Sequence, residues 1–246
     1  LVDPKPTVVT RADCKRHGLE LFEGTIAEFL GWVQKEVPHP PSLFDQIVPA
    51  PEAIFETIPP APDLVAFFSD FELVHANKRP LPTLPTRFLY GRDPSWSDID
   101  AHLDVERQDN SRVLERIKSE LAKPTDPVPL VILDEAGTGK TTIARRVAHE
   151  LVQQGIPVLS VSTSSRVDPE VAIRCLRELK GRVVVLVDSL GDHAEQIAQV
   201  LDSQVARSKF VLVGSERTYR KAFLATAFAG KTVEFLKPKR PTDREL

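Results

Sequence analysis

The sequence contains no methionine, only two cysteines and no long apolar run. Cys14 and Cys175 lie far apart and match neither a metal-binding nor a redox spacing, which indicates reduced, structural thiols of a cytoplasmic protein. The six histidines lack the close spacing of a zinc site. Because no apolar stretch approaches membrane-spanning length and no signal peptide is present, we expect no membrane segment. The net charge of −3 provides no global basic field, so nucleic acid is not an expected partner.

The two ends of the chain are typical of a piece of a longer polypeptide. Position 1 is leucine rather than methionine, and the first residues read as part of a strand. Thr242 to Glu245 fits the capping box S/T-x-x-E with which a helix begins. We therefore expect further segments of the parent protein on both sides.

The alternation of strands and helices after residue 128 predicts the fold class. Near-continuous Val/Leu/Ile strands separated by amphipathic helices predict an α/β fold, in which helices cover both faces of a parallel sheet. The strands are expected at 128–133, 156–162, 182–188, 209–214 and 231–236, and the helices near 140–153, 168–179, 193–207 and 218–228. Another amphipathic helix is expected before this alternation, at 109–122. Ligands of such sheets bind at the carboxyl ends of the strands.

Proline content divides the chain into three predicted domains, at 1–36, 37–87 and 88–246. Prolines recur every few residues in much of 37–87 and exclude long helices and sheet centres there. Apolar residues in the same stretch, Phe44 and Phe55 among them, indicate an ordered connector rather than a flexible tether. A short helix is expected at 63–73.

Residues 130–142 run from an apolar strand through a glycine turn into a helix, which is the architecture of a phosphate-binding P-loop. The glycines let backbone N–H groups fold around phosphate oxygens, Lys140 reaches the outer phosphates, and the Thr141 hydroxyl can ligate Mg²⁺. The pattern requires glycine at position 134, where this chain has Asp134 and therefore a negative charge close to the nucleotide. The alternative is an ordinary strand–turn–helix with a chance Gly-Lys-Thr. The predicted nucleotide-binding residues are Ala136, Gly137, Thr138, Gly139, Lys140, Thr141 and Thr142.

A second strand supplies the carboxylate that such a site needs. Five apolar residues precede Asp188, which is expected at the end of a strand neighbouring the P-loop strand, where it would hold Mg²⁺ together with Thr141. The alternative for Asp188 is a simple turn or cap residue. Many P-loop hydrolases carry a second acid at the next position, but this chain has Ser189, which cannot act as a general base at neutral pH. With Asp192 as the nearest further acid, we predict slow hydrolysis and a nucleotide that acts mainly as a conformational ligand.

An arginine follows the fourth strand of the core. The strand 209–214 leads into Ser215-Glu216-Arg217, and the guanidinium of Arg217 can reach the γ-phosphate. The alternative is a solvated surface arginine, and the nearby Arg220 makes the assignment ambiguous. The predicted catalytic residues are Lys140, Asp188 and Arg217.

Taken together, residues 88–246 resemble the nucleotide-binding core of a STAND-class signalling ATPase, a branch related to AAA+ ATPases. Phe88-Leu-Tyr-Gly-Arg92 resembles the F-x-G-R motif that lies near the adenine in that family, which implies that Phe88 and Arg92 bind nucleotide. Gly137–Thr142 match Walker A, Val183–Asp188 match Walker B, and Arg217 matches the arginine after the fourth strand. Asp134 and Ser189 depart from the family pattern. The resemblance implies ATP or ADP with Mg²⁺ as cofactors and a homo-oligomer as the assembled form.

Residues 1–36 are similar to the final strand and helix of sirtuin-like Rossmann domains. A sirtuin-like domain followed by a connector and a STAND ATPase is an arrangement of bacterial anti-phage defence proteins. In these proteins a phage protein is sensed by regions absent from this chain, oligomerisation follows, and the sirtuin-like part degrades NAD⁺. The resemblance implies that role for the parent protein, and no sirtuin catalytic residue lies in this chain.

Two other functions stay open from the sequence. An AAA+-like motor would hydrolyse ATP to remodel a nucleic-acid or protein partner, which the missing acid after Asp188 argues against. A nucleotide-free scaffold would result if Asp134 disabled the P-loop.

Overall fold

The computed structural model describes residues 54–74, 93–124, 126–161 and 166–239. All of them belong to one unit of the chain, Ala50–Leu246. The strand and helix that the resemblance implies within 1–36 lie outside the described residues, as does most of the proline-rich connector. The three domain boundaries therefore stay predictions.

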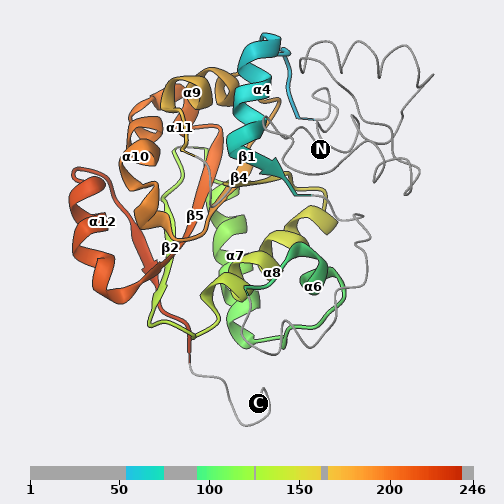
Figure 1. Cartoon of the computed structure of the whole chain (residues 1–246), viewed down its shortest axis with the longest axis vertical. Coiled ribbons are helices and arrows are strands. Elements are labelled where there is room, and N and C mark those ends of the chain that lie inside the picture. The colour runs from blue at the N-terminus through green and yellow to red at the C-terminus, as the bar shows by residue number, and fades with distance from the viewer. Residues whose placement is uncertain (1–53, 75–92, 125, 162–165, 240–246) are drawn as a thin grey trace, which may run out of the picture. The chain divides into compact units, whose positions relative to one another are not determined.

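A six-stranded sheet forms the centre of this unit, in the order β1-β3-β4-β5-β2-β6 (Figure 1). Five strands pair in parallel, and β1 pairs antiparallel with β3 at one edge. The strands are β1 Phe71–Leu73, β2 Leu130–Asp134, β3 Val158–Val161, β4 Val183–Val187, β5 Phe210–Arg217 and β6 Glu234–Leu236. This confirms the predicted α/β fold and adds an antiparallel edge strand to it.

Helices cover both faces of the sheet (Figure 1). Successive strand residues point to opposite faces, and in β4 they divide accordingly. Val183 and Val185 enter one buried cluster, whereas Val184 and Leu186 enter the other. A strand buried on both sides must be apolar throughout, which explains the continuous Val/Leu run. One face carries α6 Trp96–Asp100, α7 Gln108–Leu121 and α8 Lys140–Gln153; the other carries α4 Ala61–Asp70, α9 Pro169–Arg177, α10 Ala194–Asp202, α11 Gln204–Arg207 and α12 Lys221–Ala227.

The helix expected at 63–73 is wrong at its end. Helix α4 stops at Asp70, and Phe71 and Leu73 form β1, whose register places them opposite Val161 and Leu159 of β3. Their side chains are buried and Glu72 between them is exposed, the alternation of a strand with one face on the core. Phe71 also stacks on Phe67 of α4, with 4.6 Å between the ring centroids.

Three other expected elements differ from the structure. The helix expected at 193–207 is divided at Ser203, whose hydroxyl accepts a hydrogen bond from the Ala206 amide at 3.4 Å and caps α11. The strand expected at 209–214 continues to Arg217, and a 3₁₀ turn at 218–220 precedes α12. The strand expected at 231–236 begins only at Glu234.

The short helix α6 was not expected from the sequence. It begins with a capping box, in which the Asp98 carboxylate accepts the Ser95 amide at 2.7 Å and the Ser95 hydroxyl accepts the Asp98 amide at 3.3 Å. The buried guanidinium of Arg146 in α8 donates to the Ile99 carbonyl at 2.6 Å and also pairs with Asp104. These contacts hold the segment before α7 against the helix that follows the glycine turn.

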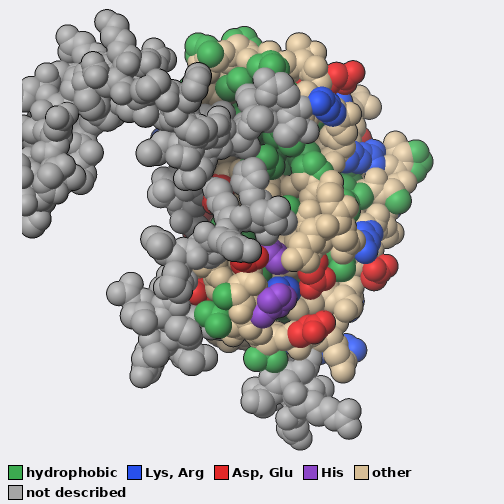
Figure 2. Space-filling model, turned by 90° about the vertical axis from the view of Figure 1, so that its right-hand side faces the viewer, with side chains coloured by type: hydrophobic (Ala, Val, Ile, Leu, Met, Phe, Trp, Pro, Cys, Tyr) green, Lys and Arg blue, Asp and Glu red, His purple; other side chains and the backbone are tan. Residues whose placement is uncertain are grey.

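One face of the described part shows no large patch of charge of a single sign. In Figure 2, positively and negatively charged side chains are interspersed over the described residues of one face. Among the described residues, no helix is both long and apolar enough to cross a membrane.

Candidate functional site

Strand order decides which residues share the carboxyl edge of the sheet. β5 pairs with β2 on one side and with β4 on the other. The expectation that the strand ending at Asp188 neighbours the P-loop strand is therefore wrong, because β5 lies between them. As a result, the end of β5 occupies the middle of the candidate site.

The glycine turn has the backbone of a P-loop. Gly137 and Gly139 have φ angles of 75° and 80°, in the left-handed region that is strained for residues with a Cβ. Helix α8 begins at Lys140, directly after Gly139. The first amides of a helix have no partner within it and carry its positive end, so the turn and α8 together can hold an anion.

The Lys140 side chain is enclosed by the site rather than extended into solvent. Its residue is 8% exposed, and Nζ donates to the Glu135 carbonyl at 2.5 Å. Burial is the main cause that lowers the pKa of Lys140 below its ordinary value. The carboxylates of Asp134 and Asp188 oppose this and raise the pKa of Lys140, whereas Arg217 lowers it further. Asp134 thus acts electrostatically on the same amine that a P-loop directs to phosphate.

Asp188 is held by three hydrogen-bond donors. The Thr141 hydroxyl donates to Oδ1 at 3.0 Å, the Ser189 amide donates to the same oxygen at 3.1 Å, and the Ser215 hydroxyl donates to it as well. Because all three bonds end on Oδ1, the orientation of the carboxylate is fixed, with Oδ2 as its second acceptor. The structure thereby brings Thr141 and Asp188, predicted as magnesium ligands, into direct contact.

Ser189 adopts a left-handed backbone conformation, with φ 51° and ψ 52°, which is uncommon for a residue other than glycine. Backbone strain of this kind is found at functional sites and turns. Asp192, the nearest further acid, forms an ion pair with Arg220 at 2.8 Å. Asp192, in the turn after β4, is therefore paired with an arginine of the 3₁₀ turn that follows β5.

Arg217 is exposed at the end of β5, where it is the register partner of Asp134. Arg220 does not share this position. Its guanidinium contacts both Asp192 and Glu216, the latter at 3.4 Å, and lies over the ring of Phe223. Of the two arginines, Arg217 is thus the one that the strand places beside the P-loop.

Two residues of the site had no assigned role in the sequence analysis. Ser215 contacts Asp188, and Glu216 is buried and accepts the Gly191 amide at 2.7 Å. A signal for Ser215 existed, because only Gly214 separates it from the apolar run of β5, much as Asp188 follows that of β4. Phe88 and Arg92, predicted to lie near the adenine, are outside the described residues, so their role stays a prediction.

The donor set fits a magnesium–nucleotide complex better than a metal held by the protein alone. Within the described ranges, no group of three or more His, Cys, Asp or Glu side chains is arranged to hold a metal ion. One carboxylate and one hydroxyl, Asp188 and Thr141, meet at the start of α8. Mg²⁺ is usually bound by one or two such protein oxygens together with phosphates and water.

Comparisons with known proteins relate this chain to a family of NTPases. A family model described as Novel STAND NTPase 5 matches residues 86–222. No curated protein matches the chain.

Similar solved structures include an Hsp104 complex and a branch migration motor. A closed-state cryo-EM reconstruction of Hsp104 with ATPγS and FITC casein aligns with a TM-score of 0.46 and 15% identity, over 61% of this chain and 30% of that chain. The RuvB Holliday junction branch migration motor of Thermotoga maritima aligns with a TM-score of 0.41 and 20% identity, over 57% of this chain and 48% of that chain. This chain thus spans less than half the length of either protein.

The family match covers the glycine turn, the ends of β4 and β5 and the turn that follows β4, which are the segments that form the site. It also extends over more than half of the 246 residues. The chain belongs to the Novel STAND NTPase 5 family.

Proposed function

We propose that this chain is an ATP- and Mg²⁺-binding switch domain. The observation that carries the proposal is the hydrogen bond of 3.0 Å between the Thr141 hydroxyl and Asp188, at the start of the helix that follows the glycine turn. Two segments distant in sequence meet there with the two oxygen ligands that a P-loop uses for magnesium.

Each group has a defined task in this proposal. The amides of the glycine turn and of the first turn of α8 bind phosphate oxygens, and the buried Lys140 ammonium compensates their charge. Asp188 and Thr141 hold Mg²⁺, which neutralises part of the phosphate charge when bound. Arg217, at the end of β5 beside Asp134, would report a γ-phosphate.

We propose further that hydrolysis is slow and that nucleotide acts as a conformational ligand. Ser189 carries no group that can take a proton from water at neutral pH. Asp192 is paired with Arg220 and so is not free to replace a missing base.

For the parent protein, we propose a bacterial STAND-type immune receptor that recognises a phage protein, forms a homo-oligomer and activates an NAD-degrading sirtuin-like effector. The family membership of residues 86–222 supports a signalling NTPase. The similarity of residues 1–36 to the end of a sirtuin-like domain supports the effector.

The proposal is tested by titrating Mg²⁺–ATP and Mg²⁺–ADP into the purified chain by calorimetry, with and without EDTA. We expect saturable binding that weakens with EDTA and is lost in Lys140→Ala. Lys118→Ala, at a half-exposed position of α7, is the matched control and should bind as the unaltered chain does. Equal binding by Lys140→Ala would refute the proposal, provided that circular dichroism shows both variants folded.

The same titrations separate the two alternatives. Steady hydrolysis stimulated by DNA or by a protein would favour an AAA+-like motor. A ligand at 100 times its Kd stabilises a protein by about 2.7 kcal/mol, so unfolding that is indifferent to millimolar ATP would favour a nucleotide-free scaffold.

A further inference from the structure

We infer that Arg107 is a positioning residue that orients the P-loop backbone and couples it to the segment after β6, residues 237–239. The inference rests on the proposed nucleotide binding, since it concerns the same turn. Arg107 directly precedes α7 and belongs to none of the motifs of the nucleotide core.

On one side, the Arg107 guanidinium holds the glycine turn from outside. Its Nη1 donates to the Thr138 carbonyl at 2.7 Å. A Cβ added at Gly139 would lie 3.2 Å from the same Nη1, so the guanidinium packs directly against this peptide unit. The carbonyl of Thr138 and the N–H of Gly139 belong to one planar trans peptide and point in opposite directions. By fixing the carbonyl, Arg107 directs the Gly139 N–H to the other side of the turn, away from its own guanidinium.

On the other side, the same guanidinium holds the segment after β6. Its Nη2 donates to the Lys239 carbonyl and to Asp109 Oδ2, the latter at 3.2 Å. Asp109 Oδ2 also accepts the Lys239 amide at 2.9 Å. Both backbone groups of Lys239 are therefore bound by Arg107 and its ion-pair partner.

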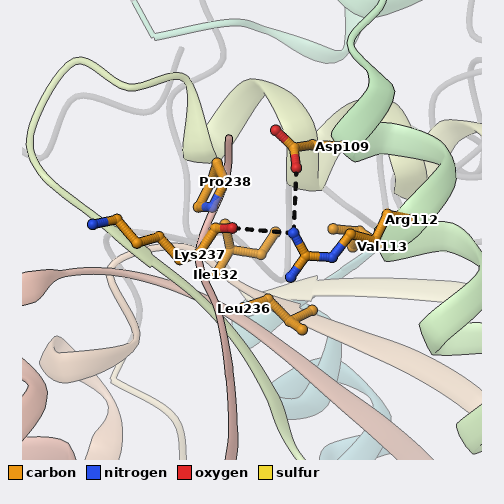
Figure 3. Close-up of a pocket in the computed structure, with 7 residues that line it drawn as sticks. All are labelled: Asp109, Arg112, Val113, Ile132, Leu236, Lys237 and Pro238. Carbon is orange, nitrogen blue, oxygen red and sulfur yellow. Dashed lines mark hydrogen bonds and ion pairs between the residues drawn. The ribbon is translucent and has the colours of Figure 1, made fainter. Parts of the chain in front are cut away.

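A second arginine holds the same segment without reaching the P-loop. Arg112 Nη1 donates to the Lys237 carbonyl at 3.3 Å and lies 3.7 Å from Asp109 Oδ1 (Figure 3). The hollow lined by these groups together with Val113, Ile132, Leu236 and Pro238 has a volume of about 10 Å³, room for about one water molecule. The segment thus packs closely on α7 and β2, and Arg112 offers a natural control.

The coupling follows from the rigidity of the guanidinium. Its nitrogens form a planar fork, so Nη1 cannot follow a rotation of the Thr138 carbonyl without displacing Nη2 from Lys239. Arg107 Nε is buried and has no hydrogen-bond partner among the described residues. A buried donor without a partner lowers the stability of the fold. By linkage, a ligand that fixes the turn also stabilises the docked position of residues 237–239. Conversely, loosening this segment lowers the affinity for the ligand by the same factor.

The test uses Arg107→Lys, which keeps the positive charge but cannot span Thr138 and Lys239 with one nitrogen. Two quantities are measured: the Kd for Mg²⁺–ATP, and hydrogen exchange at the Lys239 amide with and without Mg²⁺–ATP. In the unaltered chain, Mg²⁺–ATP should slow exchange at Lys239. In Arg107→Lys, the Kd should rise about tenfold, as expected for loss of a charged hydrogen bond, and Mg²⁺–ATP should no longer affect exchange at Lys239.

The control is Arg112→Ala, which should speed exchange within 237–239 but leave the Kd within about twofold and the response to Mg²⁺–ATP intact. An unchanged Kd in Arg107→Lys, an equal loss of affinity in Arg112→Ala, or no response of Lys239 to Mg²⁺–ATP in the unaltered chain would each overturn the inference. These results leave the proposed function standing, because binding itself is retained. Failure of the unaltered chain to bind Mg²⁺–ATP would refute both.

Discussion

Gly214 and Leu190 meet where β5 passes the turn that follows Asp188. A methyl group added at Gly214 would lie 2.6 Å from Leu190 Cδ2 and 3.2 Å from its Cβ, and Leu190 is fully buried. Leu190 must therefore move if Gly214→Ala is to fit. Because Leu190 follows Asp188 and Ser189, and Gly214 precedes Ser215, the clash involves the direct sequence neighbours of residues in the proposed magnesium site.

The magnitudes follow from this contact. Overpacking a filled core costs about 1–3 kcal/mol, whereas replacing glycine by alanine restricts the unfolded chain and returns about 0.4–1 kcal/mol. We expect Gly214→Ala to lower the free energy of unfolding by about 1–2 kcal/mol. Leu190→Ala alone should cost about 2–5 kcal/mol through the cavity it leaves.

The double variant distinguishes this contact from a general effect. The new methyl group occupies space that Leu190→Ala vacates, so the combined loss should be smaller than the sum by about 1–2 kcal/mol. Urea unfolding of the four proteins measures this coupling, and thermal midpoints should follow it by about 2–4 °C per kcal/mol. Gly181→Ala is the matched control, since a Cβ there meets nothing within 4 Å, and it should be neutral or slightly stabilising. Additive losses within about 0.5 kcal/mol would refute the reasoning.

Two further predictions concern charges. Asp134→Gly removes a carboxylate that raises the pKa of Lys140 and lies at the start of the same turn. Mg²⁺–ATP should therefore bind about fivefold more tightly, a gain of about 1 kcal/mol in binding free energy. Asp134→Asn should show part of this gain in the same titration, and equal affinities in all three proteins would contradict the prediction. Burial raises the pKa of Glu120, but hydrogen bonds from Lys123 and the Val128 amide, together with the charge and hydrogen bond of Arg116, outweigh it. The pKa of Glu120 is therefore lowered from its ordinary value of 4.5. The stability from this carboxylate is complete above about pH 4.5 and is lost as the pH falls through its lowered pKa. Glu120→Gln should thus be less stable by about 1–3 kcal/mol in urea unfolding at pH 7 and approach the unaltered chain near pH 3, and a difference that persists or widens in acid would argue against this account.

Local sequence patterns were sufficient for much of the fold. The alternation of apolar strands and amphipathic helices predicted the α/β class because burial on both faces leaves a continuous apolar run. The glycine turn with Lys140 was recognisable because its backbone conformation requires glycine at 137 and 139. The strand β1 was missed, since Phe71 and Leu73 follow an amphipathic helix and three residues give too short a pattern to indicate a strand.

The composition of the site was less predictable. Thr141 and Asp188 were predicted to lie together because both are ligands that Mg²⁺ prefers. Ser215 had no assigned role, because β5 was not expected between β2 and β4. Arg107 could not be found from the sequence. Two of its three partners, Thr138 and Lys239, are distant in sequence. A single arginine before a helix also belongs to no periodic pattern or motif.

Residue spacing alone thus predicted a glycine turn typical of phosphate binding, a strand-terminal acid and the layered architecture around them, since each depends on contacts between near neighbours in the chain. Which strand lies beside which, and therefore which hydroxyl reaches Asp188 and which guanidinium braces the turn, was settled only when distant segments packed together. The burial of both sheet faces selects one strand order for the whole unit, and no short stretch of sequence contains that information.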